Sequence, residues 1–434
     1  MLSTRIAAWL GGRHVHYGWV VVAATFLTML ATAGALSAPG VMIVPLQREF
    51  GWDTADISSA LAVRLALFGL MAPFAAALLN RFGIRPVVTA ALLLIVIGII
   101  ASFAMTQTWQ LLLLWGVLCG VGSGMIALVL GATVATRWFS HRRGLVVGLL
   151  TASTATGQLV FLPMLAALTE RHGWRLAMCV VVAGLLLALV LVLLLMRDRP
   201  SDLALPRYGD PAPVPAPPQE HGLLTLLRSP IVALRDASGS WVFWVLFGTF
   251  FVCGLSTNGL IQTHWITLCG DFGMAPVSAA GMLAVIGVFD LIGTVLSGWL
   301  SDRYDNRWLL FFYYGLRGLS LLYLPLTDFT LVGLSLFAVF YGLDWVATVP
   351  PTVRMTAERF GAERANLVFG WIFTAHQLGA ATAAFGAGAT RDAFATYMPA
   401  LVVAGLFCIL AAGLVLTVGR QPSTAAQTAP AQAG

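Results

Sequence analysis

Four ionisable side chains lie in the middle of long apolar stretches in the second half of the chain. They are Asp290, Arg317, Asp344 and His376, and a further charged residue, Arg64, lies in an apolar stretch of the first half. A charged side chain at the centre of a bilayer costs about 2.5–3.5 kcal/mol on insertion scales, so it normally faces a partner or a water-filled cavity. Arginine can hold an anion but cannot release its proton, whereas aspartate and histidine can carry protons. Together these residues predict a site that binds an anion and moves protons.

Each of these side chains also has an alternative interpretation. At about 1.5 Å per residue of helix, Asp290, Arg317, Asp344 and His376 are expected to share the depth of the bilayer midplane. Arg317 and Asp344 can form an ion pair that locks two neighbouring helices, or Arg317 can contact the substrate. Asp290, Asp344 and His376 are candidates for proton coupling. His376 is also a candidate substrate-binding residue, or a passive hydrogen bonder between helices.

Two amides and one more arginine extend the candidate substrate site. Asn258 and Gln262 are four residues apart, so a helix places them on one face. They are predicted either to bond neighbouring helices or to line the cavity. Arg64 is expected nearer the outer surface than the other charged residues, where it is a second candidate for holding an anion.

The sequence lacks the patterns typical of metal sites and nucleotide-driven enzymes. Its five cysteines are scattered among apolar runs without metal-ligand spacing. All 24 basic residues are Arg, and a Walker-type phosphate loop requires Lys, so ATP is not the expected energy source. The basic residues lie in short loops, which indicates membrane topology rather than nucleic-acid binding. We therefore expect no enzyme, no metal, no cofactor and no nucleic acid.

The composition indicates a protein that crosses the membrane many times. Hydrophobic residues make up 59% of the 434 and charged residues 10%, against about 25% charged in a typical soluble protein. Apolar stretches of about 20 residues, enough to span a bilayer core, occur twelve times. Because each span must satisfy its own backbone hydrogen bonds, an all-α fold of twelve transmembrane helices is predicted. The expected spans are 18–44, 57–79, 86–105, 109–135, 145–168, 175–196, 242–268, 276–300, 308–326, 329–352, 365–389 and 393–418.

The spans fall into two six-helix halves. The expected organisation is an N-terminal half (1–196), a cytoplasmic linker (197–240), a C-terminal half (241–419) and a disordered tail (420–434). The linker opens with RDRPSDLALPRYGDPAPVPAPPQEHG, a stretch expected to be too Pro-rich and polar to pack, and continues with LLTLLRSPIVALRD, a predicted helix on the membrane surface. With the N-terminus inside, eighteen arginines lie in inner segments and four in outer loops, so both termini are predicted to be cytoplasmic.

A charged turn occurs twice at equivalent places. ALLNRFGIRP follows the second span and GWLSDRYDNR follows the eighth, which is best explained by two homologous halves. These turns resemble the signature of the major facilitator superfamily. The resemblance implies a gate that closes the cytoplasmic side, stronger in the second half because Asn80 replaces an aspartate. The gate residues implied by the resemblance are Asn80, Arg81, Gly83, Arg85, Gly298, Asp302 and Arg303.

A narrower resemblance points to the monocarboxylate transporters and the related oxalate–formate antiporters. WFSHRRGLVVGLLTASTATG, at 138–157, is similar to a signature of the monocarboxylate transporters, and Asp290 matches an aspartate of that family. The family has an arginine four residues later and a lysine after the proline of the first span. Here Thr294 and Gly40 stand at those places. Either the substrate is not a carboxylate, or another cation holds it.

These observations predict a secondary active transporter of a small organic anion, either a mono- or a dicarboxylate, that works by alternating access. Proton symport and anion exchange both fit the residues, so protons or a counter-anion are expected partners. A drug or metabolite exporter of the same fold, or a ligand sensor that transports nothing, are the alternatives. The protein is expected as a monomer in the cell membrane, which in a Gram-negative bacterium would be the inner membrane.

Overall fold

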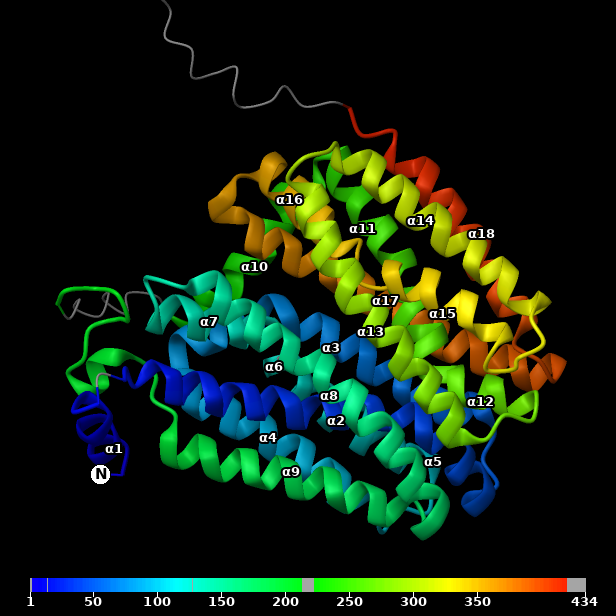
Figure 1. The fold of residues 1–434 in the computed structure, drawn as a ribbon, viewed down its shortest axis with the longest axis horizontal. Coiled ribbons are helices and arrows are strands. Elements are labelled where there is room, and N and C mark those ends of the chain that lie inside the picture. The colour runs from blue at the N-terminus through cyan, green and yellow to red at the C-terminus, as the bar shows by residue number, and fades with distance from the viewer. Residues whose placement is uncertain (1, 14, 127, 213–221, 420–434) are drawn as a thin grey trace, which may run out of the picture.

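The computed structural model of the chain describes residues 2–13, 15–126, 128–212 and 222–419, and its elements are helices (Figure 1). The α-helices are α1 (Leu2–Gly11), α2 (Gly18–Phe50), α3 (Thr54–Phe82), α4 (Ile84–Ser102), α5 (Thr108–Leu111), α6 (Cys119–Ile126), α7 (Leu128–Trp138), α8 (Arg143–His172), α9 (Trp174–Leu195), α10 (Leu223–Ser238), α11 (Trp241–Gly254), α12 (Thr263–Asp271), α13 (Pro276–Ser301), α14 (Asn306–Tyr323), α15 (Gly333–Asp344), α16 (Val349–Phe360), α17 (Ala362–Phe394) and α18 (Met398–Val415). The π-helical segments are η1 (Leu112–Leu118) and η3 (Leu255–Gln262), and the 3₁₀ turns are η2 (Pro200–Leu203) and η4 (Leu324–Leu326).

The helices account for the twelve predicted spans. Ten helical stretches of the described residues are long and apolar enough to cross a membrane, and α8 and α17 are 30 and 33 residues long. The largest difference from the expected bounds is at the tenth span, which continues to Phe360. Its last turns carry Arg354, Glu358 and Arg359. These charges end an apolar stretch, although the helix itself continues beyond it.

The spans form two bundles that meet along α3 and α17. In Figure 1 the first bundle contains α2 to α9 and the second contains α11 to α18. Thr374 of α17 donates to the carbonyl of Gly69 on α3 at 3.0 Å. A Cβ placed on Gly69 would lie 2.4 Å from the Cβ of Gln377. The absence of a side chain at Gly69 therefore lets helices of the two halves touch at mid-depth.

The two halves are also joined at the end of the molecule predicted to face outside. The Asp392 carboxylate on α17 accepts hydrogen bonds from the first N–H groups of α3, at Thr54 (3.3 Å) and Ala55 (2.6 Å). Arg391 donates to the hydroxyl of Thr54 at 3.1 Å and pairs with Asp271 at 2.7 Å. An anion at a helix N-terminus is favoured by the free N–H groups and the helix dipole. We call these five residues the outer latch.

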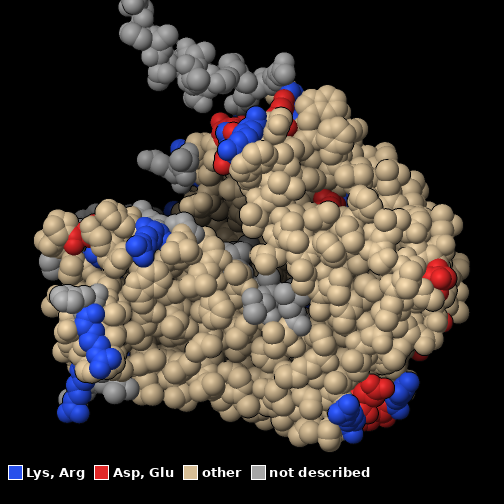
Figure 2. All heavy atoms as spheres, viewed as in Figure 1, with Lys and Arg blue, Asp and Glu red and all other residues tan. Residues whose placement is uncertain are grey.

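The opposite end of the molecule is hollowed between the halves. Figure 2 shows this hollow on the face in view, between the half that carries α7 and the half that carries α16. The molecule is therefore closed at the outer latch and open toward its inner end.

The first part of the linker packs on the N-terminal half, so the expectation that it would not pack is wrong. Asp198 accepts from the backbone N–H of Arg85 at 2.8 Å. Tyr208 exchanges backbone hydrogen bonds with Trp138 (2.9 Å) and Ser140 (3.0 Å). Apolar side chains among the prolines, such as those of Leu203, Leu205 and Tyr208, lie against the core and supply the packing that the composition obscured. Residues 213–221 and the tail at 420–434 lie outside the described residues.

The segment predicted to form a surface helix is helical, as α10, and its position on the membrane surface stays a prediction. The Trp371 indole of α17 donates to the Pro230 carbonyl of α10 at 2.7 Å. Asp236 of α10 pairs with Arg364 of α17 at 3.4 Å. The helix thus lies against the inner end of α17, the helix that forms the contact between the halves.

Candidate functional site

The tenth span is broken at mid-depth. Four residues in turns separate α15, which ends at Asp344, from α16. Pro350 and Pro351 have no N–H group, so the carbonyls of Val346 and Ala347, four residues earlier, lose their helical donors. Such irregular backbone is tolerated in a membrane only where other groups of the protein satisfy it. The break therefore creates a set of free backbone groups that need partners.

Arg317, fully buried on α14, satisfies the open end of α15. Its Nε donates to Oδ2 of Asp344 at 2.8 Å. Its Nη2 donates to the carbonyls of Asp344 and Trp345, the latter at 3.0 Å. A cation is favourable at a helix C-terminus, where carbonyls are unpaired. Of the two interpretations of Arg317, the structure shows the ion pair with Asp344, and it adds a capping role that the sequence had not indicated.

Asp290 on α13 binds the other side of the break. One of its carboxylate oxygens accepts from the backbone N–H of Val346 at 2.9 Å and from the hydroxyl of Thr294 at 3.1 Å. Ser297, two turns along α13, donates to the carbonyl of Ala347. Thr294 stands where the resembling family has an arginine, and here it serves as a donor to Asp290. Asp290 is half-buried, whereas Asp344 is buried. Asp290 is therefore the more accessible of the two acids of the site.

Asp344 is a buried acid with spare hydrogen-bonding capacity. Its side chain in the ion pair is 4% exposed. Its Oδ1 atom is buried and accepts no hydrogen bond in the described structure. An unpaired oxygen of a buried carboxylate is costly as a charged acceptor, but it can take a proton.

Cys253 and His376 link the ion pair to the contact between the halves. Nη1 of Arg317 donates to Sγ of Cys253 at 2.9 Å, and the same thiol interacts with the imidazole of His376. His376 is 8% exposed, stacks on Phe373 and leaves Nδ1 without a partner in the described structure. It lies on α17, the helix that meets α3. His376 is thus in position to pass changes at Cys253 and Arg317 to the interface.

The two amides of span seven lie in the π-helical segment η3. Asn258 and Gln262 are both half-buried, and within the described part of the chain their side-chain amides form no hydrogen bond. The backbone carbonyl of Asn258 accepts from the hydroxyl of Thr263 at 2.7 Å. Segments of π-helix occur frequently at functional sites. The side-chain amides of Asn258 and Gln262 are free to bond water or a ligand rather than a neighbouring helix.

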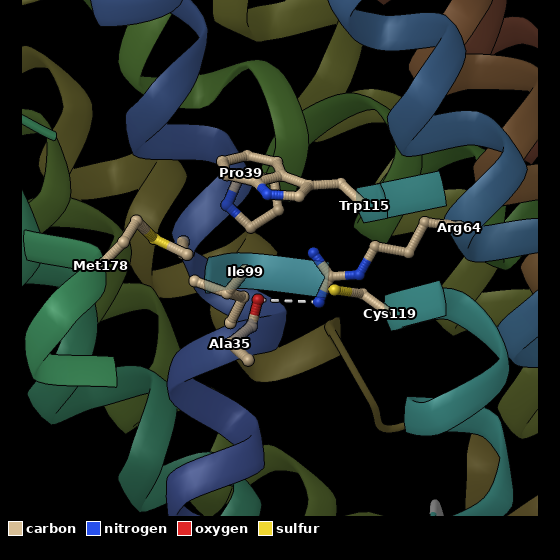
Figure 3. A pocket seen from close by; sticks show the side chains of 8 residues that line it. Ala35, Pro39, Arg64, Ile99, Trp115, Cys119 and Met178 are labelled. Carbon is tan, nitrogen blue, oxygen red and sulfur yellow. Dashed lines mark hydrogen bonds between the residues drawn. The ribbon is translucent and has the colours of Figure 1, made fainter. Parts of the chain in front are cut away.

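Arg64 does not join this cluster. Its side chain extends from α3 into the interior of the N-terminal half, where Nη2 donates to the carbonyl of Ala35 at 2.7 Å (Figure 3). Arg64 and Arg317 point into the interiors of different halves, so this arrangement does not bring together the two arginines predicted to hold an anion.

The first charged turn makes its contacts within its own half and with the linker. The amide oxygen of Asn80 accepts from Nη2 of Arg137 at 2.8 Å. Gly83 has φ of +89° and lies against Asp198, so a side chain there would collide with the carboxylate. Arg85 also donates to the carbonyl of Leu193 at 2.7 Å. Arg81 is exposed.

In the second charged turn, as in the first, the residue at the acidic position contacts an arginine of the same half. Asp302 pairs with Arg354 at 2.7 Å, as Asn80 does with Arg137. Arg303 stacks on the Trp299 ring at 4.1 Å, and Gly298 has open space beside it. The contacts described for Asn80, Arg85, Asp302 and Arg303 stay within one half or reach the linker, and the cytoplasmic gate stays a prediction.

The charged side chains of the cluster determine how it can take up a proton or an anion. Arg317 and Asp344 together carry no net charge, so this buried pair is neutral until a proton or an anion enters. Asp290 and Asp344 are the proton-accepting oxygens, and Arg317 is the cation of the cluster. Among the described residues, no group of three or more His, Cys, Asp or Glu could hold a metal ion.

Sequence reasoning missed Cys253 and Ser297, which bind the cluster directly. A thiol inside an apolar run and a serine one turn from a charged loop carry no signal of their own. The break itself had a signal, the adjacent Pro350 and Pro351 inside a predicted span.

Comparisons with known proteins agree with this architecture. The family model "Major Facilitator Superfamily" matches residues 22–384. "Monocarboxylate transporter 13" of Bos taurus is 29% identical over 408 residues, which cover 93% of this chain and 89% of that protein. "Uncharacterized MFS-type transporter YcxA" of Bacillus subtilis is 24% identical over 412 residues, 93% and 95% of the two chains.

One solved structure with a similar fold is that of a bacterial homologue of the human lysosomal transporter Spinster, titled as inward-facing and unoccupied. It superimposes with a TM-score of 0.71 and covers 92% of this chain and 96% of that chain. The sequence identity is 16%, so this likeness concerns the fold alone.

Proposed function

Because the chain belongs to the major facilitator superfamily, whose members are membrane transporters, we propose that it moves a short monocarboxylate together with a proton across the cell membrane. The mechanism is alternating access, with the substrate bound near the break in span ten. The protein works as a monomer, since each half supplies one wall of the path.

The observation that carries this proposal is the buried Arg317–Asp344 pair with its unpaired Oδ1 atom. A proton on Asp344 removes the negative charge that holds Nε of Arg317. The guanidinium then carries an unbalanced positive charge in a low-dielectric interior, where its attraction for an anion is strong. One carboxylate restores neutrality. Proton and anion binding are therefore coupled, because either one alone leaves a net charge in the buried site.

The other residues of the cluster can stay nearly in place while the substrate carboxylate replaces Asp344 at Arg317. Nη2 of Arg317 can keep its bonds to the end of α15 while Nε changes partner from Asp344 to the substrate. Asp290, half-buried beside the break, is placed to relay protons toward Asp344. His376, Asn258 and Gln262 offer polar groups for the rest of the substrate. Arg317 is expected to become accessible only after Asp344 is protonated.

The charge of the site favours a monocarboxylate over a dicarboxylate. Protonating Asp344 exposes the charge of a single guanidinium, which one carboxylate balances. A second carboxylate would need another cation, and Arg64 points into the other half. The similarity to a protein named as a monocarboxylate transporter agrees with this substrate class.

The outer latch and the inner hollow support alternating access. In the arrangement seen here the outer latch is closed and the hollow lies on the inner side, so we expect the substrate site to open toward the inside. Breaking the bonds of Asp392 to α3 and closing the inner turns would open the site to the outside. The helices α3 and α17 would rock about the close contact at Gly69.

The test is transport into liposomes that contain the purified protein. With an alkaline interior, we expect accumulation of radiolabelled lactate or pyruvate, little accumulation of succinate, and loss of the gradient-driven uptake when a protonophore is added. Arg317→Gln should abolish uptake, whereas the matched control Arg359→Gln, which changes an exposed arginine, should retain it. Uptake of organic cations instead, or undiminished lactate uptake by folded Arg317→Gln, would overturn the proposal.

A further inference from the structure

Arg64 is a buried cation that is only partly satisfied. It is 5% exposed, and its Nη2 donates to the carbonyl of Ala35 on α2. That carbonyl is free because Pro39, four residues later, has no N–H to offer it. Arg64 therefore repairs the defect that a proline leaves in α2. This single bond uses one of its five N–H donors.

The remaining donors face a small cavity inside the N-terminal half. Nε of Arg64 is buried and has no acceptor in the described structure. Besides Arg64, the cavity is lined by Pro39, Ile99, Trp115 and Cys119, among others (Figure 3). The centre of a water-sized particle can move through about 10 Å³ here, so the cavity admits one particle somewhat larger than water.

No counter-charge for Arg64 is present among the described residues. Arg64 forms no salt bridge with the described residues, and the titratable side chain that interacts with it electrostatically is Cys119. The Cys119 thiol lies 3.8 Å from the carbonyl of Ile95, to which it donates. A thiol that donates its proton is neutral, so Cys119 does not balance the guanidinium. A buried charge without a partner is strongly unfavourable.

We propose that this cavity binds a small monovalent anion of the size of chloride, held by Nε and the free Nη1 group of Arg64. The anion neutralises Arg64 and thereby stabilises the contact between α2 and α3. The site lies in the N-terminal half, apart from the break in span ten. Its size excludes lactate and pyruvate, so it is a site for an inorganic ion rather than a second substrate site.

The experiment measures thermal unfolding of the purified full-length protein in solutions of constant sodium concentration. Chloride or bromide replaces gluconate in steps, and acetate and sulfate are tested in the same way. The inference predicts a midpoint that rises with chloride or bromide and saturates, with no such rise for acetate or sulfate. A midpoint independent of chloride, or an equal rise for all the anions tested, would overturn the inference.

Three variants, two at the cavity and one away from it, assign the effect to Arg64. Arg64→Gln should remove the saturable chloride response, and Arg359→Gln, which changes an exposed arginine, should leave it intact. Ala38 also lines the cavity. If Arg64→Gln does not fold, Ala38→Val keeps the arginine and narrows the cavity, so it should weaken the response. A chloride response that is unchanged in folded Arg64→Gln, or in Ala38→Val if Arg64→Gln does not fold, contradicts the proposal. None of these measurements depends on transport, so the anion site can fail while the proposed function stands, and the reverse.

Discussion

Replacing Arg317 and Asp344 separately and together distinguishes a simple ion pair from a cap on a broken helix. Removing one partner of a buried pair costs about 3–5 kcal/mol, because the other charge stays buried. Arg317→Met and Asp344→Asn should each be destabilised by about this amount. In many proteins the double replacement by uncharged residues restores stability or improves it.

Here the double variant should not recover. Methionine cannot donate to the carbonyls of Asp344 and Trp345, which Arg317 now satisfies. A buried carbonyl left unsatisfied costs about 1–3 kcal/mol. With two such carbonyls, Arg317→Met/Asp344→Asn is expected to remain about 2–6 kcal/mol less stable than the native protein. The Cys253 thiol, which also loses its donor, adds little because it is a weak acceptor.

The assay is equilibrium unfolding in detergent micelles by added sodium dodecyl sulfate, followed by tryptophan fluorescence. The control is Arg354→Met, whose salt bridges to Asp302 and Glu358 are exposed. Exposed pairs contribute about 0–1 kcal/mol, so this variant should unfold close to the native midpoint. A double variant as stable as the native protein would refute the capping argument and leave Arg317 as a partner of Asp344 alone.

Three further predictions concern the scaffold. Asp392→Ala removes the bonds to Ala55 and its neighbour, worth about 1.5–3 kcal/mol as hydrogen bonds to a charged group, so spin labels on the outer ends of α3 and α17 should show a new, longer distance. An unchanged distance distribution would count against the outer latch. Gly379→Ala places a methyl group where an added Cβ meets a backbone carbonyl of α11, and should reduce the yield of folded protein in size-exclusion chromatography, while Gly386→Ala, in open space, should not. Asp198→Ala should increase proteolysis of the linker by detaching it from the N-terminal half, and equal cleavage rates would contradict that role.

The membrane spans were predictable because bilayer thickness and backbone hydrogen bonding leave few solutions. The common depth of Arg317 and Asp344 followed from helical rise alone, and so did the possibility of their pairing. The linker prediction was wrong because composition averages over a segment. A few anchors, such as Asp198 and Tyr208, determine whether that segment packs.

The details of the site depended on tertiary contacts that no local pattern carries. Pro39 and the pair of prolines in span ten marked where carbonyls would be freed. Which arginine would satisfy them depended on helix rotation and on neighbours distant in the sequence. Arg64 therefore looked like a substrate residue from its position in an apolar run, whereas its first contact is with a carbonyl freed by Pro39.

The central claim is that Asp344 takes up a proton when Arg317 takes up a carboxylate. The most direct test measures proton entry with a trapped pH dye and radiolabelled lactate entry in the same liposomes, at several membrane potentials. The account predicts one proton for each lactate, a rate independent of potential, and loss of proton entry in Asp344→Asn. Lactate entry driven by potential without proton entry, or proton coupling that survives in Asp344→Asn, would contradict it.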